Sequence, residues 1–314
     1  MECDLLEMSE PASRHVSVLL EEALALVDPR PGQTIVDGTF GGGGHARALA
    51  RRVAPTGRVF ALDRDRAVVE RALSQPNELP LTPLWADYRD LRQVLDDVGV
   101  GQVEGVLVDI GLSSDQLADE ARGFGFESAG PLDLRFDVSE GRPAADLVHR
   151  LEERELADLI FRYGEERHSR RIARAIVERR RARPIAAAAE LAEIVRRAVP
   201  PSPDARRIHP ATRTFQALRI AVNDELGALE TLLREAPRSI RQGGRLVVIS
   251  FHSLEDRLVK EAFRDDARYR SLTKKPITAG DAEVAANSRA RSAKLRAAEL
   301  VCWLRRRRRP QAAS

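Results

Sequence analysis

Short apolar runs alternate with amphipathic stretches in the first third of the chain. The runs at 33–36, 57–62, 81–85 and 105–108 are each followed within a few residues by an acidic or aromatic side chain. Apolar runs of this length are typical of strands buried on both faces, and polar residues at their carboxyl ends line the ligand-binding edge of an open sheet. The pattern therefore predicts a doubly wound, Rossmann-like α/β sheet with a binding site at that edge.

The segment after the first predicted strand is rich in glycine. Asp37 ends the strand, and residues 38–44 contain five glycines before a helix that we expect to begin near His45. Glycine at this density allows the backbone to approach a ligand closely. The loop lacks the Gly-Lys-Ser/Thr ending of a P-loop, which disfavours ATP or GTP. Asp37 would repel a pyrophosphate, which disfavours a dinucleotide. A carboxylate here favours a cationic ligand, such as S-adenosylmethionine with its sulfonium and ammonium groups.

Asp63 ends the second predicted strand, close to the offset of about 20 residues at which a doubly wound domain places an acid on ribose hydroxyls. A fixed carboxylate can accept hydrogen bonds from both hydroxyls. The alternative is that Asp63 only caps the helix that follows, where aspartate is favoured. The two roles are compatible.

Helical periodicity replaces the strand pattern after about residue 118. We expect helices at 144–150, 152–163, 166–183, 186–199 and 214–235, and strands at 244–251, 269–277 and 293–303. The chain then divides into a flexible N-terminus, a sheet domain in two pieces, an inserted all-helical domain and a basic tail. Their expected boundaries are, in that order, 1–14, 15–118 with 211–304, 119–210, and 305–314.

Charge is balanced overall but uneven along the chain. The sequence has 51 Lys and Arg against 48 Asp and Glu, giving a formal net charge of +3. The predicted helix at 166–183 turns apolar residues inward, and arginines dominate the rest of its surface. We expect Arg174 on this surface to contact RNA phosphates. The alternative is a solvated face with internal ion pairs, which Glu166 and Glu178 could supply.

Cysteine content and hydropathy limit the compartment. The only cysteines are Cys3 and Cys302, too few and too far apart in sequence for a disulfide framework or a zinc site. No apolar run reaches the roughly 18 residues of a membrane span, and the acidic start of the chain does not resemble a signal peptide. We therefore expect a cytoplasmic protein without a metal and without a membrane partner.

Several segments resemble the RsmH (MraW) family of bacterial ribosomal RNA methyltransferases, which methylate N4 of a cytidine in the decoding region of 16S ribosomal RNA. The resemblance covers nearly the whole chain after residue 14, with the motifs in the family order. Asp115 and Ser288 stand where the family usually has proline, which leaves local loop shape open. The matching segments are 15–20, 37–45, 109–114, 130–135, 209–219, 248–256 and 289–296.

The resemblance implies a class I methyltransferase fold, S-adenosylmethionine as the cofactor, and 16S ribosomal RNA within the small ribosomal subunit as the partner. Tyr88 would stack near the adenine, although it could be an ordinary core aromatic. The backbone N–H of His45, at a helix start, would bind the methionine carboxylate. The cofactor contacts implied by the family pattern are Gly43, Gly44, His45, Asp63, Tyr88, Asp109 and Gln116.

Catalysis requires a group that accepts hydrogen bonds from the N4 amine, whose lone pair is delocalised into the ring. Our hypothesis assigns this to Asp109, with the backbone carbonyls of Ile110 and Gly111. The alternative is that Asp109 touches only the methionine part of the cofactor.

The inserted helical domain would help to recognise the substrate. Expected substrate contacts are Arg174, Arg213, Gln216, Arg219 and His252, and further pocket candidates are Asn223, Asp224, Glu225 and Ser253, with helix capping as the alternative for Ser253 and Asp256.

Other functions remain open from the sequence. The chain could be a methyltransferase of the same fold that acts on DNA or on another RNA base, or a non-catalytic, cofactor-binding factor of ribosome assembly. An NAD-linked dehydrogenase is a further alternative function. Neither a heptad pattern nor an exposed apolar stripe fixes the oligomeric state, so a homodimer is also open.

Overall fold

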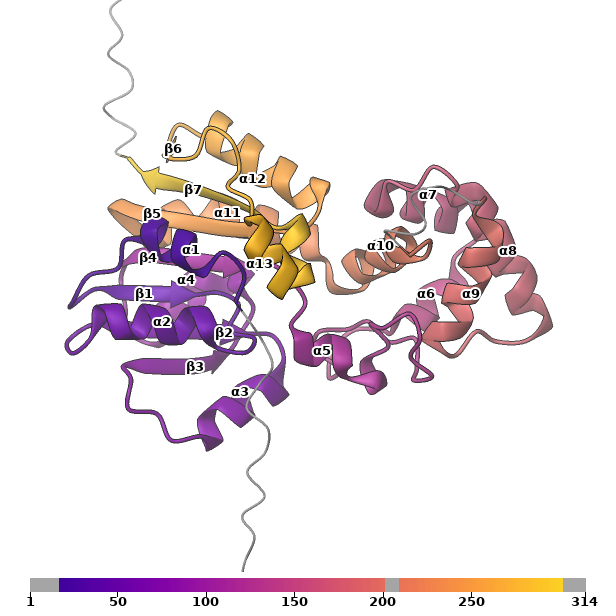
Figure 1. The fold of residues 1–314 in the computed structure, drawn as a ribbon, viewed down its shortest axis with the longest axis horizontal. Helices are drawn as coiled ribbons and strands as arrows, with labels where there is room; N and C mark the ends of the chain where they lie inside the picture. The colour runs from indigo at the N-terminus through magenta and orange to yellow at the C-terminus, as the bar shows by residue number, and fades with distance from the viewer. Residues whose placement is uncertain (1–16, 201–208, 302–314) are drawn as a thin grey trace, which may run out of the picture.

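The computed structural model describes residues 17–200 and 209–301. Figure 1 shows a lobe built around a sheet and, beside it, a lobe of helices. The predicted flexible N-terminus, the basic tail and the last residues of the predicted strand at 293–303 lie outside the described residues.

The sheet has seven strands in the order β3-β2-β1-β4-β5-β7-β6. The first five are parallel, and β7 runs antiparallel between β5 and β6. This order confirms the predicted doubly wound sheet. The strands are β1 (Thr34–Asp37), β2 (Arg58–Asp63), β3 (Leu81–Trp85), β4 (Val103–Asp109), β5 (Ile240–Ser250), β6 (Tyr269–Ser271) and β7 (Lys294–Leu300).

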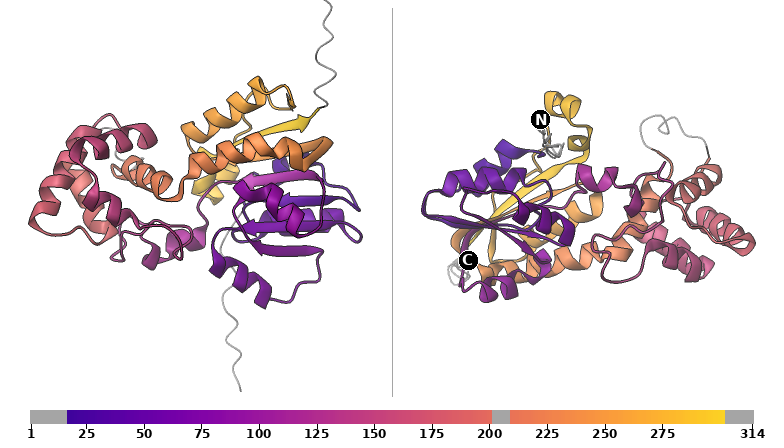
Figure 2. Two further views of the ribbon diagram at one scale, coloured as in Figure 1. Left: turned by 180° about the vertical axis from the view of Figure 1, so that it is seen from behind. Right: turned by 90° about the horizontal axis from the view of Figure 1, so that it is seen from below.

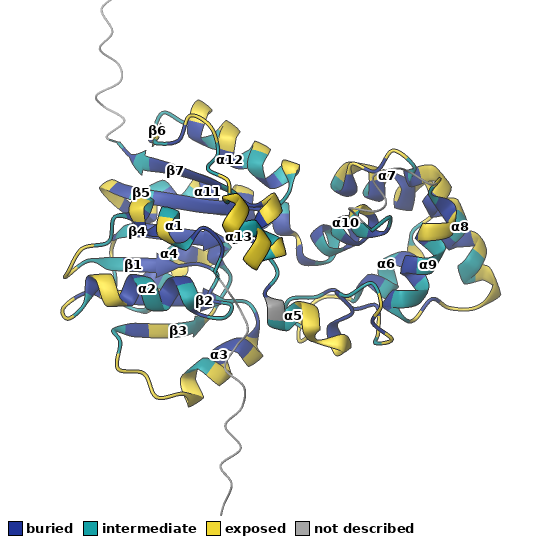
Figure 3. Cartoon of the chain, viewed as in Figure 1, coloured by how far each residue is buried: buried dark blue, intermediate teal, exposed yellow. Residues whose placement is uncertain are grey.

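Helices cover both faces of the sheet, as Figure 2 shows. Alternate residues of one strand therefore enter different cores: Ile35 packs with α1 and α2, whereas Val36 packs on the side of α4 and α11. Burial on both faces explains why the strands read as continuous apolar runs, and Figure 3 shows them mostly buried. The helices of this lobe are α1 (Leu20–Val27), α2 (Gly44–Val53), α3 (Arg66–Ser74), α4 (Leu91–Asp97), α11 (Glu225–Ser239), α12 (Ser253–Asp265) and α13 (Asp281–Ala286).

The helical lobe has a core of its own. Ile160, Ile172, Leu191 and Phe215 meet in it from four different helices. Because α10 contributes Phe215 to this core, it belongs with the helical lobe here, whereas the expected boundary at 210/211 placed it with the sheet. The helices of this lobe are α6 (Ala144–Arg150), α7 (Glu153–Gly164), α8 (Ser169–Ala182), α9 (Ala188–Ala198) and α10 (Thr212–Asn223), and the short α5 (Ser114–Ala118) lies at its junction with the sheet lobe.

Three predictions about the second half of the chain need correction. The single helix predicted at 214–235 is wrong, because Asp224 takes a left-handed conformation (φ 50°) and separates α10 from α11. The strand predicted at 269–277 ends at Ser271, and Ile277 forms only an isolated bridge with Leu295. The fifth strand begins at Ile240 rather than 244, and its register with β4 shifts between Val103 and Gly105.

Within the described residues, no helix is both long and apolar enough to cross a membrane.

Candidate functional site

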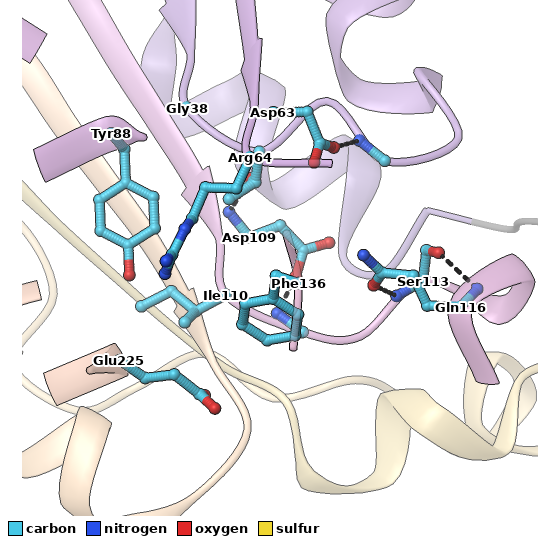
Figure 4. A pocket seen from close by; sticks show the side chains of 13 residues that line it. Gly38, Asp63, Arg64, Tyr88, Asp109, Ile110, Ser113, Gln116, Phe136 and Glu225 are labelled. Carbon is cyan, nitrogen blue, oxygen red and sulfur yellow. Dashed lines mark hydrogen bonds between the residues drawn. The ribbon is translucent and has the colours of Figure 1, made fainter. Parts of the chain in front are cut away.

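A pocket opens at the carboxyl edge of the parallel strands, where the register brings three acids together. Asp37 pairs with Ala61 of β2 and Leu107 of β4, two residues before Asp63 and Asp109 respectively. Figure 4 shows the pocket at close range. Its lining residues are Gly38, Thr39, Gly41, Asp63, Arg64, Tyr88, Asp109, Ile110, Gly111, Ser113, Gln116, Phe136 and Glu225.

Asp37 is a buried carboxyl group behind the pocket lining. Its Oδ1 accepts the backbone N–H of Thr39 (3.0 Å), but its Oδ2 has no hydrogen-bond partner among the described residues. Burial, together with the negative charges of Asp109 and Asp63, raises its pKa to about 8. A cation bound in front of this group would relieve the repulsion and favour the ionised form.

The stability of the protein should therefore depend on pH through Asp37. Its pKa rises from 3.8 to about 8 on folding, so the folded state holds a proton that the unfolded state releases in this window. The free energy of unfolding must then fall as pH rises through it. We expect Asp37→Asn to remove this pH-dependent loss of stability. The melting temperature of the variant should therefore rise relative to that of the wild type as the pH increases from about 5 to about 8. Calorimetry of both ligand-free proteins measures this, and a pH-independent difference would contradict it.

The glycine loop is held against Asp63. The backbone N–H of Gly41 donates to Asp63 Oδ2 (2.8 Å), and Gly43, at φ 76°, is the N-cap of α2. A Cβ on Gly43 would lie 2.8 Å from the ring of Phe40, and one on Gly44 would clash with Ser17. Burial raises the pKa of Asp63 to about 6, although hydrogen bonds from Asp65 and Gly41 oppose this. The glycines thus shape the loop, and Asp63 is the group that faces the pocket.

Asp109 ends β4 in the middle of the site and is mostly buried (8% exposed). Its backbone N–H donates to Thr39 Oγ1 (2.7 Å), and its Oδ2 lies 3.7 Å from His45 Nδ1. His45 Nε2 lies 3.1 Å from the carbonyl of Val18, which can only accept a hydrogen bond, so this geometry places the proton on Nε2. The His45 ring therefore anchors the loop rather than entering the pocket.

Ser113 and Gln116 form a reciprocal capping box at the start of α5. Ser113 Oγ accepts the N–H of Gln116, and Gln116 Oε1 accepts the N–H of Ser113, both at 3.0 Å. The box orders the chain directly after β4, where it leaves the sheet for the helical lobe, and presents both side chains to the pocket.

The structure brings four of the seven expected cofactor residues into the pocket wall: Asp63, Tyr88, Asp109 and Gln116. Gly43, Gly44 and His45 lie behind it, so a cofactor contact from them stays a prediction. Tyr88 also belongs to the apolar core beside α4 and α11, and burial, with the nearby acids Asp87, Glu225 and Glu255, raises its pKa well above the ordinary value. The core role is thus present, and adenine stacking stays a prediction.

Two important lining residues were missed. Arg64 directly follows Asp63 at the end of β2, and this position at the ligand-binding edge could have indicated a pocket residue. Phe136 gave no signal, because it enters from the helical lobe: its backbone N–H donates to Asn223 Oδ1 (2.7 Å), 87 residues away. Asn223 is thus a scaffold for the pocket, and of the further candidates only Glu225 lines it.

The expected substrate residues are spread over three environments. Arg174 is exposed (71%) and pairs with Glu178 at 2.9 Å, so the surface carries both an arginine face and an internal ion pair. Gln216 Nε2 donates to the carbonyl of Tyr163 (3.0 Å), and Arg213 Nη1 to that of Glu165 (3.4 Å). Arg219 is buried against Glu225. Substrate contact by these residues stays a prediction.

The remaining candidates lie at the start of α12. His252 is the N-cap of α12, in a capping box with Glu255. Ser253 contacts Glu165 of the helical lobe. Asp256 binds Arg296 (2.6 Å), so it is an ion-pair partner rather than a cap. These contacts give all three residues a structural role.

Glu225, His252 and Glu255 are the described residues whose ligand atoms gather as at a metal site, all within 4.8 Å of one another. The chemistry of the donor set opposes a metal. Both oxygens of Glu225 receive hydrogen bonds from Arg219, and His252 Nδ1 accepts the N–H of Glu255 (3.4 Å), which leaves the ring proton on Nε2. Nε2 lies 2.9 Å from Glu255 Oε1, outside hydrogen-bonding angles. The group is a buried charge cluster.

Comparison with known proteins bears on the whole chain. The model of the MraW methylase family matches residues 12–301. Proteins called ribosomal RNA small subunit methyltransferase H are similar at high coverage. The one from Deinococcus deserti is 52% identical over 289 residues, covering 91% of this chain and 93% of that protein. The one from Acidobacterium capsulatum is 49% identical over 297 residues, covering 91% and 98%.

Proposed function

Because the chain belongs to the MraW methylase family, we propose that it transfers the methyl group of S-adenosylmethionine to the N4 amine of a cytidine in small-subunit (16S) ribosomal RNA. The observation that carries the proposal is the gathering of three carboxyl groups beside a glycine loop: Asp37 and Asp109 are buried, and Asp63 is half-buried. Three acids at one strand edge repel one another, which suits a ligand that brings positive charge.

Each part of the site has a task in this proposal. S-adenosylmethionine supplies a methyl group activated by the positive sulfur. Asp63 accepts the ribose hydroxyls, and the negative charges of Asp37 and Asp109 balance the sulfonium and ammonium groups. The first N–H groups of a helix have no partner within it, and we assign those at the start of α2, including that of His45, to the methionine carboxylate.

Asp109 lines the pocket at the end of β4, and we place the target amine beside it. We assign it, with the backbone carbonyls of Ile110 and Gly111, to accept a hydrogen bond from N4. This interaction draws the lone pair out of the ring and stabilises the positive charge that develops on nitrogen. Much of the rate gain would be positional, because the pocket walls would hold the base and the cofactor against each other.

The helical lobe offers a surface for ribosomal RNA. The inward face of α8 is apolar, while Arg170, Arg171, Arg174 and Arg181 are exposed. Figure 3 shows the exposed side of this helix pointing away from the lobe's core. We assign these arginines to RNA phosphates, and Arg213 and Gln216 of α10 to the RNA nearer the pocket.

Arg174→Ala should weaken binding to ribosomal RNA without changing cofactor affinity. Loss of one phosphate contact is expected to reduce RNA affinity about 3- to 10-fold and to lower the slope of log affinity against log salt by about 1. Filter binding at several salt concentrations measures both. Arg154→Ala is a matched control, because Arg154 is also exposed and pairs with an acid four residues on, Asp158. Equal effects of the two substitutions would argue against a specific role for α8.

The decisive test of the function is mass spectrometry of ribosomal RNA nucleosides from a strain lacking the gene. We expect the loss of one N4-methylcytidine and its return with the wild-type gene. An unchanged pattern would remove the proposal, and loss of a different methylated nucleoside would favour a same-fold methyltransferase acting on another base.

A further inference from the structure

Glu225 is a third carboxylate in the pocket lining, beside Asp63 and Asp109, and it has no part in the cofactor site proposed above. In the view of Figure 4, Asp109 lies between Asp63 and Glu225. Glu225 is only 2% exposed, yet it lines the pocket. A buried carboxylate is costly to maintain unless it is paired, and the cofactor proposed above does not require one at this end.

Arg219 pairs with Glu225 across the break between α10 and α11. Arg219 Nε donates to Oε1 (2.8 Å) and Nη2 to Oε2 (3.0 Å). This two-bond fork fixes the plane of the carboxylate. Burial lowers the pKa of Arg219, but the charges of Glu225 and Glu255 outweigh it and keep the guanidinium protonated. Glu225 is also the first residue of α11, where the helix dipole favours a negative charge.

The surroundings of Glu225 suit a planar base with an amino group. Ile110 and Phe136 supply apolar lining to the pocket, against which a planar base can pack, and the Phe136 ring is itself held by Phe124 and by the guanidinium of Arg64. An amine on a pyrimidine has two N–H groups, so Asp109 and Glu225 can each accept one. A carbonyl oxygen at the same ring position would instead face a fixed carboxylate and be repelled.

We propose that Glu225 binds the exocyclic amine of the target base and selects cytosine over uracil, with Arg219 as the residue that positions its carboxylate. The inference rests on the proposed function and adds to it the group that recognises the target. It also gives Arg219 a role through Glu225 rather than through RNA phosphates.

The experiment compares the affinity of the enzyme, saturated with S-adenosylhomocysteine, for two kinds of reconstituted small subunit. One carries the target cytidine mapped by mass spectrometry, and the other carries uridine at that position. We expect the wild type to bind the cytidine form about 10-fold tighter or more. Glu225→Gln should bring this ratio close to one, because an amide can accept from an amine or donate to a carbonyl.

Three further measurements fix the interpretation. Glu104→Gln, which removes a carboxylate at the far end of β4, should keep the wild-type ratio. Cofactor affinity and melting temperature show whether Glu225→Gln is folded. Arg219→Lys keeps the charge but loses the fork, so it should lower the ratio partly, and it decides the question if Glu225→Gln is unfolded.

A folded Glu225→Gln variant with the wild-type cytidine-to-uridine ratio would overturn the inference, as would an unchanged ratio in Arg219→Lys when Glu225→Gln does not fold. Failure of the proposed function looks different: the wild type itself would then transfer no methyl group to ribosomal RNA.

Discussion

Asp109→Asn is expected to slow single-turnover methyl transfer by about 100- to 1000-fold at saturating cofactor. The amide keeps the shape of the side chain but removes the negative charge that stabilises positive charge on the attacking nitrogen. Rapid quench with radiolabelled cofactor measures the rate, and calorimetry measures cofactor affinity separately.

The separation of the two measurements decides between the roles open to Asp109. Weaker cofactor binding with unchanged single-turnover transfer would exclude the catalytic role and leave only the contact with the methionine part. Asp97→Asn, at the exposed end of α4, serves as the control and should change neither quantity.

Asp63→Asn should lower the affinity for S-adenosylmethionine by about 100-fold, because two hydrogen bonds from ribose to a half-buried charged acceptor are weakened together. Asp63 also accepts the N–H of Gly41, so the glycine loop loses part of its support. Titration calorimetry with the cofactor measures the loss.

Asp96→Asn, an exposed substitution paired only with Arg92, is the control for this experiment and should bind the cofactor normally. A loss of methyl transfer in Asp63→Asn without a loss of cofactor affinity would show that ribose does not lie on this carboxylate.

The parallel strands β1 to β4 could be predicted because each has a local pattern in the sequence. A strand buried on both faces reads as an apolar run, and Asp37, Asp63 and Asp109 at the run ends marked the ligand edge. Parallel pairing then places these ends side by side without further information. The acids of the pocket were therefore accessible from the sequence.

The other wall of the pocket was not accessible in this way. Phe136 reaches it through Asn223, a contact between residues far apart in the sequence. Asp224 breaks the helix in a left-handed conformation. The break was missed because apolar periodicity continues on both sides of Asp224, and a single left-handed residue leaves no gap in that pattern. Arg219 was expected to contact the substrate, and its pairing with Glu225 could not be predicted because that pairing depends on the break.

The two connections between the lobes have a mechanical consequence. The chain leaves the sheet through Gly111 and Ser113 and returns through Glu225, and all three residues are pocket walls. Any tilt of the helical lobe relative to the sheet would therefore move these three wall residues and change the shape of the pocket.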